Sequence, residues 1–141
     1  MEGSLTASDE SRHFYTPWQI AVAAIIGGPL AGGFLCRRNH LAFGASKKAT
    51  IVVAVSVMVV VLAIVLGWLV PPRVPRSGFA FLIAAAYRWY AELAFAEAIA
   101  LHRSEGWARQ SWWQAIWVSI AFLVGTLLVM VLGLFIVSEH A

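Results

Sequence analysis

Four long apolar segments constrain the fold of this chain more than any other feature of its sequence. They cover residues 18–36, 50–70, 79–101 and 113–137, and each holds about the 20 residues that a helix needs to cross the hydrocarbon core of a bilayer. Hydrophobic residues make up 61% of the chain and charged residues 12%, whereas soluble domains have roughly 45–50% and 25%. A soluble fold could not bury that much apolar surface. We therefore predict an all-α, multi-pass membrane protein with four transmembrane helices in an antiparallel bundle.

The segments also set the domain organisation. Residues 1–16 are polar and predict a mobile tail, which leaves one transmembrane domain over residues 17–138. Thr16 and Pro17 are typical of the start of a helix, as N-cap and first helical residue. Three prolines between the second and third segments predict a stiff, non-helical connection, because proline lacks the backbone N–H that a helix needs; they are Pro71, Pro72 and Pro75.

Basic residues predict the orientation of the bundle. With four crossings, the connections after the first and third segments share one side, and six basic residues lie there: Arg37, Arg38, Lys47, Lys48, Arg103 and Arg109. Three lie on the other side: Arg12, Arg73 and Arg76. The positive-inside rule then places both termini outside and the basic connections in the cytoplasm. This asymmetry explains the net charge of +3, and we expect no nucleic-acid partner because no basic patch with stacking aromatic residues is present.

The third segment carries three charged residues, Arg88, Glu92 and Glu97. A charge at membrane depth costs about 2.5–3.5 kcal/mol on insertion scales, so such residues are expected to be paired, buried in protein or functional. Arg88 and Glu92 are four residues apart, in reach of an ion pair. They lie in a row with alanines at the same spacing (Ala80, Ala84, Ala96 and Ala100), and small residues mark a packing face. We therefore predict that this pair points into the bundle, while Glu97 lies on another face beside Tyr90.

Three interpretations of these charges remain open. The pair can fix which helices are neighbours, it can form part of a proton or ion path with Glu97, or it can contact another membrane protein. A path would need further polar residues on neighbouring segments, and the second and fourth segments offer only Ser56, Ser119 and Thr126. Contact with a partner is therefore the preferred functional interpretation.

The first segment contains the most distinctive local sequence, Gly-Gly-Pro-Leu-Ala-Gly-Gly over residues 27–33. Gly28 and Gly32 form a GxxxG step that lets another helix approach closely. Pro29 removes one helical hydrogen bond and predicts a kink. One interpretation is a tight crossing against another segment. The alternative is a broken helix that exposes backbone carbonyls to a cation or substrate, as in transporters.

Catalytic patterns are not found in the sequence. The histidines lie in predicted tails or connections, with no metal-binding or nucleophile motif around them; they are His13, His40, His102 and His140. Cys36 is the only cysteine, which excludes an intramolecular disulfide and a cysteine metal cluster. We expect a protein that is not an enzyme and that needs no cofactor or metal.

Three short stretches carry a resemblance to a known group of proteins. Tyr15-Thr-Pro-Trp-Gln-Ile20, followed by Ile26-Gly-Gly-Pro-Leu-Ala-Gly-Gly33 and Arg38-Asn-His40, resembles the opening of small, uncharacterised bacterial inner-membrane proteins. The match covers about 30 residues, and beyond residue 44 it rests on the number of spans. The resemblance implies a bacterial cytoplasmic membrane and no particular activity.

The function expected from the sequence is therefore binding within the bilayer. The chain is predicted to bind another membrane protein, or further copies of itself, through small-residue helix faces and the Arg88–Glu92 pair. Such a protein would be an accessory or assembly subunit, or an immunity protein against a membrane-acting toxin. The candidate interaction residues are Gly28, Pro29, Gly32, Arg88, Tyr90, Glu92 and Glu97. The alternative is a small, oligomeric ion- or proton-coupled transporter or channel.

Overall fold

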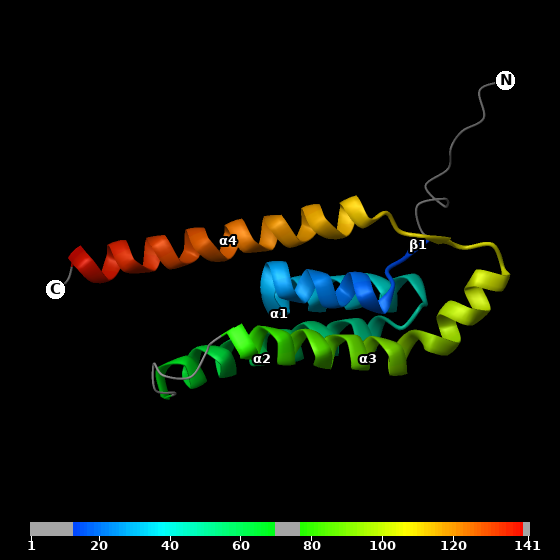
Figure 1. The fold of residues 1–141 in the computed structure, drawn as a ribbon, viewed down its shortest axis with the longest axis horizontal. Coiled ribbons are helices and arrows are strands. Elements are labelled where there is room, and N and C mark those ends of the chain that lie inside the picture. Colours follow the sequence, from blue (N-terminus) through cyan, green and yellow to red (C-terminus); the bar gives the residue numbers. More distant parts are fainter. Residues whose placement is uncertain (1–12, 70–76, 140–141) are drawn as a thin grey trace, which may run out of the picture.

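The computed structural model describes residues 13–69 and 77–139, nearly all of them helical (Figure 1). The helices are α1 (Pro17–Ala42), α2 (Ser46–Leu69), α3 (Ser77–Ser104) and α4 (Trp112–Glu139). All four are long and apolar enough to cross a membrane. The predicted fold class, an all-α bundle of four membrane-length helices, is confirmed, and the chain is a multi-pass membrane protein. Residues 1–12 of the predicted tail over 1–16 lie outside the described residues, and so does the proline-rich connection over 70–76.

α1 is the centre of the bundle, and each of the other three helices packs mainly on it. In the most apolar part of α1, 61% of the residues are buried, against 17% in α2, 17% in α3 and 11% in α4. Two of the outer helices are also more apolar than α1, with a mean hydropathy of 3.1 in α2 and 2.6 in α4 against 1.7 in α1, whereas α3, which carries the charged residues, has 1.2. This is the distribution expected when lipid covers the outer helices and protein covers the inner one.

α1 reverses its direction at Gly28 and is a helical hairpin. Gly28 has φ 75° and ψ −172°, outside the helical range. A straight helix of 26 residues would separate its ends by about 39 Å, yet the backbone N–H of Tyr15 donates to Asn39 Oδ1 over 2.8 Å. We call residues 17–27 the first arm, residues 29–42 the second arm, Gly28 the tip, and the end where Tyr15 meets Asn39 the open end. Each arm is shorter than the roughly 20 residues of a membrane crossing.

The hairpin changes the predicted path of the chain. The sequence predicted one crossing over residues 18–36, with both termini on one side. Because α1 returns to the end from which it starts, residue 13 lies at the same end of the bundle as the connection between α3 and α4, and α4 ends at the opposite end (Figure 1). The expectation that the start of α1 and the end of α4 share one side is therefore wrong. The kink predicted at Pro29 is a full reversal, which takes place at Gly28.

A short parallel pairing closes the open end. β1 (His13–Phe14) pairs with β2 (Ala108–Arg109), which lies in the connection between α3 and α4. The N–H of Gln110 then donates to Phe14 O over 2.9 Å. The sequence did not predict this pairing, because two-residue strands have no hydrophobic period to detect. It fixes the segment that enters the hairpin beside the segment that leads into α4.

Candidate functional site

The tip of the hairpin depends on one glycine. Gly28 adopts a positive φ of 75°, which L-residues with a Cβ rarely adopt. Pro29 follows directly and begins the second arm, where its fixed φ suits the first turn of a helix and its missing N–H would have no helical partner. The sequence predicted that Gly28 lies on a packing face, but within this chain no helix packs against it: apart from its neighbours in the sequence, no atom lies within 4 Å of the place where its Cβ would be. Gly28 turns the chain, and other glycines make the close contacts.

Three glycines of the hairpin each face a different neighbouring helix. A Cβ on Gly27 would lie 2.6 Å from the backbone oxygen of Ser119 in α4, and a Cβ on Gly32 would lie 3.3 Å from the ring of Tyr87 in α3. A Cβ on Gly33 would overlap the hydroxyl of Ser56 in α2. The predicted role of Gly32 in close helix packing is confirmed. The glycine-rich sequence therefore lets α2, α3 and α4 all approach one hairpin.

Polar side chains hold the two arms together at the open end. Asn39 Oδ1 accepts from Tyr15 N over 2.8 Å, and Asn39 Nδ2 donates to Tyr15 O over 2.7 Å. Arg38 Nη1 also donates to the hydroxyl of Tyr15 over 3.2 Å. Asn39 is fully buried, so both of its hydrogen bonds satisfy groups that would be costly to leave unpaired. Two of the three stretches that carry the sequence resemblance, around Tyr15 and around Asn39, meet here.

Gln19 extends this network to α4. Thr16 caps α1, as predicted, and forms a reciprocal capping box with Gln19. The side-chain nitrogen of Gln19, Nε2, donates to the backbone oxygen of Gln110 over 2.7 Å, just before α4 begins. Gln19 is fully buried. The Thr-Pro-Trp-Gln sequence therefore both starts the first arm and joins it to the connection that leads into α4.

A second polar contact joins the end of the second arm to α3. His40 Nε2 lies 2.8 Å from the hydroxyl of Tyr90, and the His40 ring packs against Phe95 with centroids 4.7 Å apart. Phe43 lies beside Phe95 and His102. The sequence predicted Tyr90 beside Glu97 as part of a separate face, whereas Tyr90 contacts the hairpin. This cluster anchors the hairpin to α3.

Arg88 and Glu92 form the predicted ion pair. Arg88 Nε donates to Glu92 Oε1 over 2.8 Å. The guanidinium also lies over the ring of Trp18, 4.0 Å from its centroid, which is a favourable cation–π geometry. Trp18 is the second residue of α1. The pair therefore lies near the middle of α3 along the chain, and beside the open end of the hairpin.

The pair is not buried, and this corrects the prediction. The side chains of Arg88 and Glu92 are 39% and 48% exposed. Of the alanine row that was expected to face the bundle, Ala84 is buried, while Ala80, Ala96 and Ala100 are exposed. The buried positions of α3 are instead Ala84, Ala91 and Phe95. Because α3 wraps on the hairpin along this different row, the ion pair lies at the edge of the contact, on an open surface.

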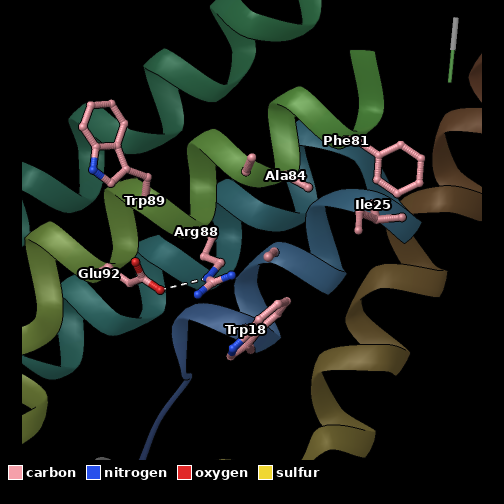
Figure 2. A pocket seen from close by; sticks show the side chains of 9 residues that line it. Trp18, Ile25, Phe81, Ala84, Arg88, Trp89 and Glu92 are labelled. Carbon is pink, nitrogen blue, oxygen red and sulfur yellow. Dashed lines mark hydrogen bonds and ion pairs between the residues drawn. The ribbon is translucent and has the colours of Figure 1, made fainter. Parts of the chain in front are cut away.

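A groove of about 380 Å³ begins at this pair and runs between α1 and α3. Figure 2 shows Arg88 between Glu92 and Trp18, with Ile25 and Phe81 farther along the groove. Trp89 borders the groove and points away from α1. Small residues form much of the lining: Ala21, Ala84 and Ala85. We take this groove, lined by residues 18–25 and 81–92, as the candidate binding site and call it the α1–α3 groove.

The remaining predicted residues lie elsewhere. Glu97 is exposed and does not line the groove, and Gly28, Pro29 and Gly32 belong to the hairpin. Trp18 was missed as a site residue, because a tryptophan at the start of an apolar segment is typical of the head-group layer. The described residues include no group of three or more His, Cys, Asp and Glu side chains placed to hold a metal ion. The groove presents one guanidinium, one carboxylate and an apolar surface, a combination suited to binding a molecule that has both polar and apolar parts.

Comparisons with protein-family models, with curated proteins and with solved structures found no match to this chain.

Proposed function

We propose that this chain is a non-catalytic integral membrane protein that binds another molecule of the membrane in the α1–α3 groove. The observation that carries the proposal is the exposure of the Arg88–Glu92 pair on the outside of a bundle whose exposed side chains are mostly large and apolar. Charged groups within membrane segments normally face protein or water. An occupant with polar groups of its own would cover this pair and remove its contact with lipid tails.

The sequence led us to expect that the occupant is another membrane protein, with this chain as an accessory or assembly subunit or an immunity protein, or a second copy of this chain. The proposed location is the bacterial cytoplasmic membrane, supported by the resemblance of the first segment. Six basic residues lie at or beside the open end of the hairpin or in the α3–α4 connection. The positive-inside rule favours a cytoplasmic position for that end.

Site-specific photo-crosslinking tests whether the groove binds anything. A benzophenone amino acid at Ala85, which lines the groove, is irradiated after the protein has been extracted from its native membrane and purified in detergent. The matched control carries the same group at Val57 of α2, which is also exposed but lies outside the groove. We expect a defined adduct at Ala85 and detergent adducts alone at Val57. The same adducts at both positions would overturn the proposal.

The hairpin favours a second candidate function, a small ion- or proton-coupled transporter. Irregular backbone at membrane depth occurs where it is covered by protein or lines a water-filled cavity, and transporters place broken helices at their binding sites. The tip at Gly28 is such a break. Proton or cation flux into liposomes containing the purified chain, lost in Glu92→Gln or Gly28→Ala, would support transport. No flux above that of empty liposomes would exclude it.

A further inference from the structure

The α1–α3 groove changes character along its length. Its polar groups lie together at one end, at Arg88, Glu92 and the indole N–H of Trp18. Ile25 follows Trp18 by about two helical turns, and Phe81 precedes Arg88 by about two turns, which is roughly 10 Å along each helix. Between them the lining is apolar: Ala21, Ala84 and Ala85. The groove therefore has a charged end and an apolar end.

This gradient has a direction relative to the bundle. The charged end adjoins Trp18 at the open end of the hairpin, which is also the end that carries the basic connections. The apolar end points toward the tip, which the helices enclose. Tryptophan and basic residues are typical of the head-group layer, and apolar surface is typical of the hydrocarbon layer. The charged end of the groove therefore corresponds to the head group of a phospholipid, and its apolar end corresponds to the acyl chains.

Arg88 has hydrogen-bond donors left for a ligand. Arginine carries five N–H donors. Its Nε donates to Glu92, and the face of its guanidinium lies over the ring of Trp18. Among the described residues, none accepts a hydrogen bond from the four N–H groups on its two Nη atoms. These form the planar fork that binds phosphate through two parallel hydrogen bonds. The exposed edge of Arg88 is therefore suited to the phosphate of a lipid head group.

Glu92 suits the other charge of a zwitterionic head group. Its carboxylate accepts one hydrogen bond from Arg88 through Oε1 and is about half exposed. A carboxylate can accept several further hydrogen bonds. A primary ammonium donates three hydrogen bonds, whereas a quaternary ammonium donates none. A cation and an anion side by side therefore complement a phosphate and a primary ammonium side by side.

We propose that the groove holds one phospholipid whose head group combines a phosphate with a primary ammonium. The phosphate lies on Arg88, the ammonium on Glu92, and the start of one acyl chain over Ala84 toward Ile25. The groove of about 380 Å³ is in the range of small-molecule sites, roughly 300–1,000 Å³. Over the roughly 10 Å length of the groove, a helix about 10 Å across would occupy roughly 800 Å³, about twice the volume of the groove, so the groove is better matched to an acyl chain than to a helix. This inference rests on the proposed binding function, because it names the occupant of the same groove.

Lipid competition tests the inference. The full chain in detergent is offered equal amounts of three phospholipids with identical acyl chains and ethanolamine, choline or glycerol head groups, and native mass spectrometry counts the lipids retained. We expect one retained lipid, with ethanolamine preferred about tenfold over choline, which is the effect of one hydrogen bond to a charged group. Equal retention of the three lipids by the unmodified chain would overturn the inference without the need for any variant.

Three variants assign the groups. Arg88→Gln is expected to lower the retention of all three lipids about tenfold through loss of the phosphate contact. Glu92→Gln is expected to remove the preference for ethanolamine and to leave binding of the phosphate. Arg103→Gln, at the exposed end of α3 and outside the groove, is the matched control. It should change neither the total amount of lipid retained nor the preference for ethanolamine over choline. Unchanged retention in Arg88→Gln would contradict the proposal.

The crosslinking experiment separates this inference from the proposed function. A phospholipid adduct at Ala85 supports both. A protein adduct there, from a partner or from a second copy, overturns the lipid inference and leaves the binding function in place. The absence of any specific adduct overturns both.

Discussion

A methyl group added at Gly33 is expected to push α2 away from the hairpin. The new Cβ of Gly33→Ala would overlap the hydroxyl of Ser56 and lie 2.6 Å from Ser56 Cβ, whereas carbon atoms pack at about 3.5–4.0 Å. Rotation of Ser56 cannot relieve the contact with its Cβ. A rotated Ser56 would also lose the hydrogen bond that the Tyr87 hydroxyl donates to it over 2.7 Å. The backbone of α2 must therefore move by about 1 Å or more.

The magnitude follows from three contributions. Overpacking costs about 1–3 kcal/mol, and the lost Tyr87 hydrogen bond costs about 0.5–1.5 kcal/mol. Replacing a helical glycine by alanine returns up to about 1 kcal/mol. We expect Gly33→Ala to lower the free energy of unfolding by about 1–3 kcal/mol. Reversible unfolding in mixed detergent micelles, followed by helical circular dichroism, measures this difference.

Three further proteins make the test specific. Gly67→Ala, in α2, places its methyl where no atom lies within 4 Å, so it should be neutral or slightly stabilising. Ser56→Gly removes the group that the new methyl would strike. Combined with Gly33→Ala, it should therefore lower stability by less than the sum of the two single changes, by about the overpacking cost of 1–3 kcal/mol. Equal stability of the Gly33→Ala and Gly67→Ala proteins, or an additive double variant, would refute the reasoning.

Three other predictions concern the hairpin. Gly28→Ala forces a Cβ into positive φ and should cost about 1–2 kcal/mol in the same unfolding assay; an unchanged protein would show that the tip relaxes to another conformation. Asn39→Ala leaves the N–H and carbonyl of Tyr15 without their buried partner and should cost about 2–4 kcal/mol, with Asn39→Asp, which keeps only the acceptor, in between. Cysteines placed at His13 and at Ser138, in a chain whose own cysteine is replaced, should react with a membrane-impermeant maleimide from opposite sides of sealed vesicles. Reaction of both from one side would mean that α1 crosses the membrane.

Much of this fold is visible in the sequence, because length and hydropathy are local properties. The described parts of the four apolar segments fall within the four helices, the Thr16 cap is present, and the Arg88–Glu92 pair forms as its spacing predicts. The glycine-rich sequence is a place of close helix packing, as predicted, but its break is a reversal and not the predicted kink.

The direction of α1 after Gly28 could not be read in the same way. Hydropathy is identical for a segment that crosses and for one that turns back, and a Gly-Pro step is compatible with a mild kink or a full reversal. The deciding contacts join Tyr15 to Asn39 and Gln19 to Gln110, pairs that are far apart in the sequence. The exposure of Arg88 could not be predicted either, because it depends on which row of α3 meets the hairpin.

The reversal of α1 also bears on the order in which this protein is assembled. Neither arm is long enough to be held in the bilayer as a crossing, and the backbone groups near Gly28 need a protein cover at membrane depth. That cover comes from α2, α3 and α4, which leave the ribosome after α1. The hairpin is thus synthesised first but can complete its packing only after α2, α3 and α4 are in the membrane. We therefore expect it to stay near the membrane surface until these three helices surround it.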